Sequence, residues 1–236
     1  MPRDVLGWRA RIGVVGPSTN TILQPDMEAL RPEGVTNHFS RIATPGMALS
    51  SDADFARLVE ALVEAVGPAV DLCRDAAPDR MILGVSALAF WGGRQAVAER
   101  IAALEARAGC AVTAGSTALE EALHQLGAGR IAVLSPYFPV MDDQIAGFFE
   151  EGGLTVAGMR ALRCPSPHAI ARVDAATLRA AVAELDGENI DAIVQVGTNL
   201  SMRAVAEAAS AALGKPVLAV NAVTYRNALA RVGAAS

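Results

Sequence analysis

Residues 11–20 read RIGVVGPSTN and residues 130–139 read RIAVLSPYFP, so an apolar strand pattern followed by a small polar turn occurs twice, 119 positions apart. Two further stretches repeat. MILGVSAL from Met81 matches AIVQVGTNL in type, with Val85 facing Gly197, and VTAGSTALEEAL, ending at Leu123, resembles VLAVNAVTYRNAL, ending at Leu229. Such repetition indicates a duplicated half. We therefore expect an α/β fold of two pseudo-symmetric lobes, each a mainly parallel sheet flanked by helices, with an interlobe cleft.

The pattern around these repeats also predicts alternating strands and helices. Strands are expected over 11–15, 80–85, 110–115, 130–135, 154–159, 191–196 and 215–220. The clearest helix is expected to begin at Asp52 as N-cap and to kink or end at Pro68. Its apolar face comprises Phe55, Leu58, Val59, Leu62, Val63 and Val66. We expect lobe 1 to comprise residues 1–112 and 218–236, and lobe 2 residues 113–217.

The composition excludes several classes of protein. The chain has 236 residues, a net charge of −5 and only 4% aromatic residues, which argues against nucleic acid as a partner. No apolar stretch approaches the ~20 residues that span a bilayer, so we expect a cytoplasmic protein without membrane contact. Lys215 is the single lysine among 20 basic residues, and this nearly excludes Schiff-base chemistry with pyridoxal phosphate.

The cysteines and glycines argue against bound metals and nucleotides. Cys73, Cys110 and Cys164 are too scattered for a disulfide framework, and no Cys/His spacing predicts zinc. Gly13 and Gly16 follow Arg11, but the Gly-x-Gly-x-x-Gly order of a dinucleotide site is missing. We expect reduced thiols, no metal and no cofactor.

Small hydroxyl and amide residues follow six of the expected strands, where ligands of parallel sheets bind. They are Ser18, Thr19 and Asn20; Ser86; Ser116 and Thr117; Ser135 and Tyr137; Thr198 and Asn199; and Asn221. With the N–H groups of the following helices, these side chains suit a carboxylate. The alternative is that they only cap those helices.

The order of these motifs resembles the aspartate/glutamate racemase superfamily, in its maleate cis-trans isomerase and arylmalonate decarboxylase branch. The matching segments are PSTN at 17–20, His38-x-x-Arg41, GSTALEEAL at 115–123, SPY at 135–137 with Asp142-Asp143, and GTNL at 197–200. The resemblance extends from about Arg11 to Leu229. It implies a two-lobed α/β enzyme that needs no cofactor or metal, acts on a small carboxylic acid and forms homo-oligomers.

The resemblance also implies site residues. The family's two catalytic cysteines fall at Val85 and Gly197, so both thiols are missing here. Tyr137 falls on the family's active-site tyrosine, which donates a hydrogen bond to the substrate. The substrate-binding positions implied by the resemblance or by the strand ends are Asn20, Ser18, Ser86, Ala87, Ser116, Thr117, Thr198, Asn199 and Arg41, with Ala87 replacing a hydroxyl of the decarboxylases.

The missing thiols leave the reaction open. Tyr137, His168 and His38 are the candidate proton-transfer groups, and Cys164 lies four residues before His168. His124, near the end of a helix, is expected to be structural. The first hypothesis is an isomerase or decarboxylase that stabilises an enediolate or oxyanion. The alternatives are an inactive carboxylate-binding protein, or a lyase or hydrolase in which a histidine activates water.

Overall fold

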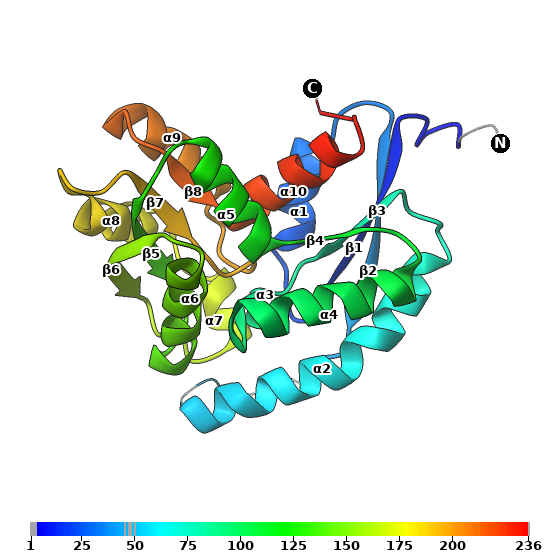
Figure 1. Cartoon of the computed structure of the whole chain (residues 1–236), viewed down its shortest axis with the longest axis horizontal. Helices are drawn as coiled ribbons and strands as arrows, with labels where there is room; N and C mark the ends of the chain where they lie inside the picture. The colour runs from blue at the N-terminus through cyan, green and yellow to red at the C-terminus, as the bar shows by residue number, and fades with distance from the viewer. Residues whose placement is uncertain (1–3, 45, 47–48, 50, 236) are drawn as a thin grey trace.

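The chain forms two separate four-stranded sheets, seen as two halves in Figure 1. The computed structural model describes residues 4–44, 46, 49 and 51–235. The first sheet contains β2 (Val35–Ile42), β1 (Ala10–Pro17), β3 (Arg80–Leu83) and β4 (Val112–Ala114), in that order. The second contains β6 (Thr155–Ala161), β5 (Arg130–Ser135), β7 (Ala192–Gln195) and β8 (Val217–Ala219).

The two sheets have the same topology. Every strand pair is parallel, and the order β2-β1-β3-β4 becomes β6-β5-β7-β8 when each strand is replaced by its counterpart four strands later. The prediction of two similar α/β lobes is therefore confirmed. In each sheet the central strands are mainly apolar and buried except near their ends, because helices cover both faces.

Helices follow the strands in both halves. In the first half they are α1 (Leu23–Leu30), α2 (Asp52–Arg74), α3 (Ser86–Phe90), α4 (Gly93–Ala108) and α5 (Gly115–Gln125). In the second half they are α6 (Pro139–Glu151), α7 (Pro167–Ala171), α8 (Ala175–Leu185), α9 (Arg203–Leu213) and α10 (Val220–Arg231). The last helix returns to the first sheet, because Tyr225, Ala228 and Leu229 share one apolar cluster with Ile12 and Val14. The lobe boundaries stay a prediction.

Helix α2 differs from its prediction at three positions. The N-cap is Ser51, whose side chain accepts a hydrogen bond from the Asp54 N–H at 3.2 Å, and not Asp52. The helix continues beyond Pro68 to Arg74, because the proline lies on the solvent side, where water can bind the freed carbonyl. Val63, expected on the apolar face, is 50% exposed.

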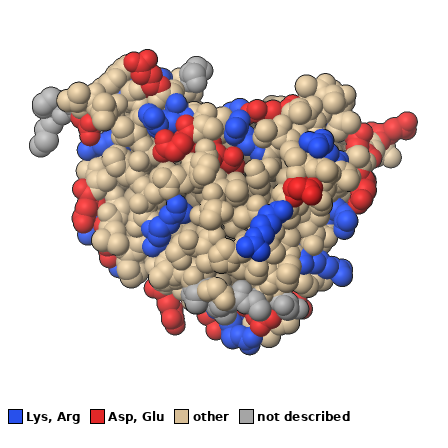
Figure 2. All heavy atoms as spheres, turned by 180° about the vertical axis from the view of Figure 1, so that it is seen from behind, with Lys and Arg blue, Asp and Glu red and all other residues tan. Residues whose placement is uncertain are grey.

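Strand β2 is missing from the strands predicted by apolar runs. Its sequence, VTNHFSRI, is largely polar, and only Val35, Ser40 and Ile42 are buried. The strand lies at the edge of the first sheet beside β1, where one side needs no apolar cover. Among the described residues no helix is long and apolar enough to cross a membrane. Figure 2 shows basic and acidic side chains interspersed over the face opposite the view of Figure 1.

Candidate functional site

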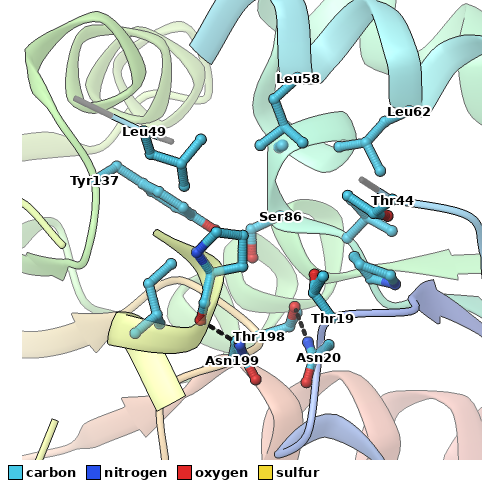
Figure 3. A pocket seen from close by; sticks show the side chains of 15 residues that line it. Thr19, Asn20, Thr44, Leu49, Leu58, Leu62, Ser86, Tyr137, Thr198 and Asn199 are labelled. Carbon is cyan, nitrogen blue, oxygen red and sulfur yellow. Dashed lines mark hydrogen bonds between the residues drawn. The ribbon is translucent and has the colours of Figure 1, made fainter. Parts of the chain in front are cut away.

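A small cavity lies where the carboxyl ends of the two sheets meet (Figure 3). Its volume is about 50 Å³, a few times the ~10–15 Å³ needed by one buried water, so it suits a ligand of few atoms. The lining comprises Pro17, Thr19, Asn20, Thr44, Leu49, Leu58, Leu62, Val85, Ser86, Ala87, Tyr137, Pro167, Ile170, Thr198 and Asn199. The turns after β1, β3, β5 and β7 therefore converge, as expected from the strand-end rule.

Hydrogen bonds between the turns hold the two halves together below the cavity. The Asn20 side-chain amide donates to Thr198 Oγ1 at 3.0 Å, and that hydroxyl donates to the Gly84 carbonyl at 3.1 Å. Asn199 Oδ1 accepts the Thr21 N–H at 3.0 Å, while its Nδ2 donates to the Pro167 carbonyl at 2.8 Å. The polar atoms of Asn20, Thr198 and Asn199 are thus mostly hydrogen-bonded to other groups of the protein.

Asn20 has a second structural role. Its Oδ1 accepts the N–H groups of Ile22 and Leu23, at 3.0 and 2.9 Å, where α1 begins. Asn20 therefore holds the turn that leads into α1 and also lines the cavity, while its role in binding a carboxylate stays a prediction.

Tyr137 presents its hydroxyl to the cavity (Figure 3). The side chain is buried, and its ring contacts Phe55 edge to face, with 5.4 Å between ring centroids. Burial raises the pKa of the phenol well above its usual value, and a hydrogen bond from Ser86 only partly opposes this. Tyr137 therefore stays protonated near neutral pH, where it is a hydrogen-bond donor and a poor base.

Ser86 links this phenol to the backbone of the other half. Its Oγ accepts the Gly197 N–H at 3.2 Å, and Ser86 also lowers the pKa of the Tyr137 phenol. Gly197, Ser86 and Tyr137 are therefore neighbouring polar groups, and the phenol among them lines the cavity. Ser86 and Ala87 open α3, whose first N–H groups no side chain caps. Together these groups form a neutral set of donors on one side of the cavity.

The opposite side of the cavity is aliphatic. Leu58 and Leu62 project from α2, and Leu49 lies ahead of that helix. Ile170 of α7 also lines the cavity. Among the described residues that line the cavity, none is charged, and none is a cysteine or a histidine. Among the described residues no cluster of three or more His, Cys, Asp or Glu side chains is arranged to hold a metal ion.

Position 197 strongly disfavours a side chain. Its φ is +97°, in the region that disfavours side chains, and an added Cβ would lie 2.5 Å from Pro136 Cγ and 3.6 Å from the Tyr137 hydroxyl. Val85, its counterpart in the first half, has φ −137° and places an aliphatic side chain in the lining. Where the resemblance implies a thiol pair, Val85 lines the cavity and Gly197 offers no side chain, because the Pro136 ring occupies that space.

Several predicted site residues lie outside the lining. His38 is in the middle of β2, with Nε2 3.0 Å from Thr36 Oγ1. His168 is exposed in the first turn of α7, between the lining residues Pro167 and Ile170. Arg41 donates to the Asn20 carbonyl at 3.0 Å and to Gln24 Oε1 at 2.6 Å, so it braces the turn from outside. None of these three is among the groups that line the cavity.

The remaining predicted positions have structural surroundings. Ser18 is exposed and exchanges hydrogen bonds with the backbone of Thr44, at 3.3 and 3.0 Å. Ser116 and Thr117 open α5, away from the lining; Ser116 is fully buried with no partner for its hydroxyl, and Thr117 bonds the Ala114 carbonyl. His124, in the last turn of α5, also lies outside the lining.

Cys164 is bonded to the segment that contains Tyr137. Its N–H donates to the Pro136 carbonyl at 2.8 Å, and a negative charge on it would raise the pKa of Tyr137. Burial raises the pKa of this thiol. Burial likewise raises the pKa of Cys73 to about 11. These thiols therefore stay protonated at neutral pH, as expected of core residues.

Leu49, Leu58, Leu62, Thr44 and Ile170 are site residues that the sequence analysis missed. Leu58 and Leu62 were expected only as part of an apolar helix face, and that face does pack inward. No signal along the chain distinguishes a leucine that faces a core from one that faces a cavity. Only the position of α2 across the strand ends shows the difference.

Comparisons with known proteins show which family and which solved structures this chain is similar to. A family model described as arylmalonate decarboxylase matches residues 12–236. Maleate isomerase of Pseudomonas putida is 31% identical over 91% of this chain and 89% of its own, and arylmalonate decarboxylase of Bordetella bronchiseptica is 31% identical over 64% of each chain. The solved structure of Nocardia farcinica maleate cis-trans isomerase with a covalently bound succinylcysteine intermediate has a TM-score of 0.85 and 24% identity, covering 95% of this chain and 93% of that chain.

Proposed function

This chain belongs to the arylmalonate decarboxylase family, and from that premise we propose that it removes CO₂ from a small 2-substituted malonate in the cavity between its lobes. The observation that carries the proposal is the division of the lining. Neutral donors lie on one side, around Tyr137 and Ser86, and aliphatic side chains lie on the other, around Leu58 and Leu62. That division suits an acid with two carboxylates on one carbon.

The two carboxylates of such an acid meet different environments. One accepts hydrogen bonds from the Tyr137 phenol and the first turn of α3. The other faces Leu49, Leu58 and Leu62, which offer no hydrogen bonds, so its charge is poorly solvated there. Loss of that group as CO₂ relieves the cost, because CO₂ is neutral.

The bond changes need no thiol. The bond between the α-carbon and the leaving carboxylate breaks, and its electron pair passes into the remaining carboxylate to form an enediolate. Charge then grows on the oxygens that face Tyr137 and Ser86, and donors placed for that charge lower the barrier. A proton from water finally binds the α-carbon and gives the monocarboxylic acid. The same steps require no cofactor.

Isomerisation of a maleate-like acid is less well supported. Addition to a double bond requires a nucleophile, and no cysteine lines the cavity. A hydrolase or a water-activating lyase requires a base, and neither His38 nor His168 belongs to the lining. The second candidate is a protein that binds a small carboxylate without turnover, favoured by a lining in which Tyr137 is the single titratable group.

Proton NMR with methylmalonate, ethylmalonate, phenylmalonate and maleate tests the proposal. We expect methylmalonate to give propionate, and we expect smaller substituents to react better because the cavity is small. Ser86→Ala should lower kcat by about 100-fold. Ser116→Ala is the matched control, since Ser116 also opens a helix after a strand but lies outside the lining. A thermal shift with methylmalonate but no turnover would favour the binding protein.

A further inference from the structure

The strands β3 and β7 end on different residues at equivalent positions. Leu83 is the last residue of β3 and Gln195 is the last residue of β7. Each is paired with the last residue of the neighbouring edge strand, Ala114 in β4 and Ala219 in β8. Leu83 is 3% exposed and Gln195 is 1% exposed. The fold thus accepts an aliphatic side chain at this place, and a buried amide there requires a separate explanation.

The Gln195 side chain holds the turn that follows it. Its Nε2 donates to the Val196 carbonyl at 2.5 Å and to the Gly197 carbonyl at 2.9 Å. Its Oε1 accepts the N–H of Val220, the first residue of α10, at 3.4 Å. Both amide hydrogens are therefore bound to backbone carbonyls, and Gln195 itself is not among the described residues that line the cavity.

These two hydrogen bonds fix the direction of two peptide groups. In a trans peptide the C=O and the N–H point to opposite sides, and no peptide bond among the described residues is cis. The N–H opposite the Val196 carbonyl is that of Gly197, and it donates to Ser86 Oγ at 3.2 Å. Because the same Nε2 also holds the Gly197 carbonyl, the N–H of Thr198 is turned to the same side, that of Ser86 and the cavity.

The Thr198 N–H is left for a ligand. Within the described part of the chain no group accepts it, whereas the Gly197 carbonyl on the opposite side also accepts the Leu200 N–H at 3.1 Å. Thr198 is 8% exposed and lines the cavity. A buried N–H without a partner is costly, so a ligand or a water that accepts this hydrogen bond is stabilised here.

Asn221, the second residue of α10, holds the next peptide group in the same way. Its Nδ2 donates to the Thr198 carbonyl at 3.0 Å. The N–H opposite that carbonyl belongs to Asn199, another lining residue. Side-chain amides behind the turn thus bind three consecutive carbonyls, those of residues 196–198. In lobe 1 the helix α3 begins directly after the equivalent turn, so helical geometry aligns the peptide groups there.

We propose that Gln195 is a positioning residue that holds the Gly197–Thr198 peptide with its N–H toward the cavity, where it donates to the carboxylate that Ser86 also faces. This donor is neutral and is oriented before the ligand binds. Without the amide both carbonyls lose a donor, and the glycine between the two peptides lets them rotate. That the ligand is a malonate rests on the proposed function, whereas the direction of the N–H does not.

NMR of a single peptide group tests the proposal. Gly197–Thr198 is the one Gly–Thr pair in the chain, so protein labelled with carbonyl-13C glycine and 15N threonine gives a signal from that peptide alone. In the wild type we expect propionate to move the Thr198 amide proton downfield, because the N–H donates to the carboxylate. Gln195→Met has a side chain of similar length without donors. In this variant the Gly197 carbonyl signal should move upfield before any ligand is added, and most of the response to propionate should be lost.

Three results would overturn the proposal. The first is a Gly197 carbonyl signal that is the same in the wild type and in Gln195→Met. The second is an equal response of the Thr198 proton to propionate in both proteins. The third is a wild-type Thr198 proton that propionate does not move.

A second variant and a control complete the test. Gln195→Leu copies Leu83 and should fold and behave as Gln195→Met. Gln144→Met is the matched control, because Gln144 also binds a turn, accepting the Gly92 N–H at 2.8 Å, but is not a lining residue. It should keep the wild-type signals and response. If methylmalonate is turned over, both Gln195 variants should lower kcat/KM by roughly 10-fold, and an unchanged kcat/KM would contradict the proposal. A Thr198 response without any turnover would refute the proposed function and leave this inference standing.

Discussion

Lobe 1 and lobe 2 share a topology but support the cavity differently. After β1, Asn20 reaches across to Thr198 and also caps α1, so the turn of lobe 1 ties the halves together. After β5, Tyr137 directs its hydroxyl into the cavity, and its N–H donates to the Oγ of buried Ser135. The duplication thus gives two equivalent turns with different roles. The turn after β1 bonds lobe 2, and the turn after β5 places the Tyr137 hydroxyl at the cavity.

The turns after β3 and β7 differ in the same way. Val85 fills part of the lining with a side chain, while Gly197 contributes an N–H that orients Ser86. The left-handed backbone at Gly197 and the Pro136 ring exclude a side chain there. The site therefore depends on neighbouring polar groups of both lobes, Gly197 and Tyr137 in lobe 2 and Ser86 in lobe 1. Each group can be changed separately by substitution.

The largest effect should come from Tyr137, one of the two buried tyrosines of the chain. Tyr137→Phe removes the donor at the cavity and should lower kcat about 100- to 1,000-fold with little change in folding. Tyr225→Phe is the control; it loses the 2.8 Å hydrogen bond to Asn37, away from the cavity, and should keep turnover within about twofold. Equal losses in both variants would mean that the Tyr137 hydroxyl has no special role. Steady-state kinetics with methylmalonate would measure both.

Gly197→Ala sharpens the comparison of β3 with β7. A Cβ would meet Pro136 at 2.5 Å and would adopt a strained φ, so we expect a loss of about 2–4 kcal/mol in the free energy of unfolding. Gly214→Ala is the control, because Gly214 also has positive φ but nothing within 4 Å; it should cost only about 1 kcal/mol. Urea unfolding of both variants would show whether the contact or the backbone decides the cost. Similar losses would contradict the steric argument.

Asp142→Asn should change how stability depends on pH. The pKa of this carboxyl is about 6 in the folded protein and 3.8 as its reference value. The folded state therefore binds the proton more tightly, and the wild type loses stability as pH rises from about 4 to about 6. Relative to wild type, the variant should gain roughly 1–3 kcal/mol between pH 4 and pH 7.5. Asp143→Asn should show a much smaller gain, and a constant difference across pH would refute the buried charge.

The smallest effect concerns the two helix starts. Asn20→Ala removes two acceptor contacts at α1 and the bond to Thr198, and should cost about 1–2 kcal/mol. Its equivalent in lobe 2 is Pro139, the first residue of α6, which accepts no such bonds. Pro139→Ala should therefore cost less than about 1 kcal/mol. Thermal unfolding of Asn20→Ala and Pro139→Ala would measure both losses. A larger loss for Asn20→Ala would show that its hydrogen bonds to Thr198 and to the start of α1 stabilise the fold.

The repeats in the sequence predicted the two lobes because strand and turn patterns are local. They could not predict β2, whose polar residues form an edge strand by pairing with β1. They placed Tyr137, Ser86, Asn20, Thr198 and Asn199 at the cavity through the strand-end rule. They misplaced Ser116, because the turn after β4 packs against α10 instead. Leu58 and Leu62 line the cavity because α2 lies across the strand ends. The periodicity of the sequence predicts the apolar face of this helix but not where the helix lies.

The most direct test of thiol-free decarboxylation is proton NMR in D₂O with methylmalonate and maleate, using the wild type and Cys164→Ala. Cys164 is buried, and its N–H donates to the carbonyl of Pro136, the residue before Tyr137. We predict that both proteins convert methylmalonate to propionate carrying one deuterium at C2, at rates within about threefold, and leave maleate unchanged. Conversion of maleate to fumarate by the wild type, lost in Cys164→Ala, would contradict the account and assign the chemistry to a thiol.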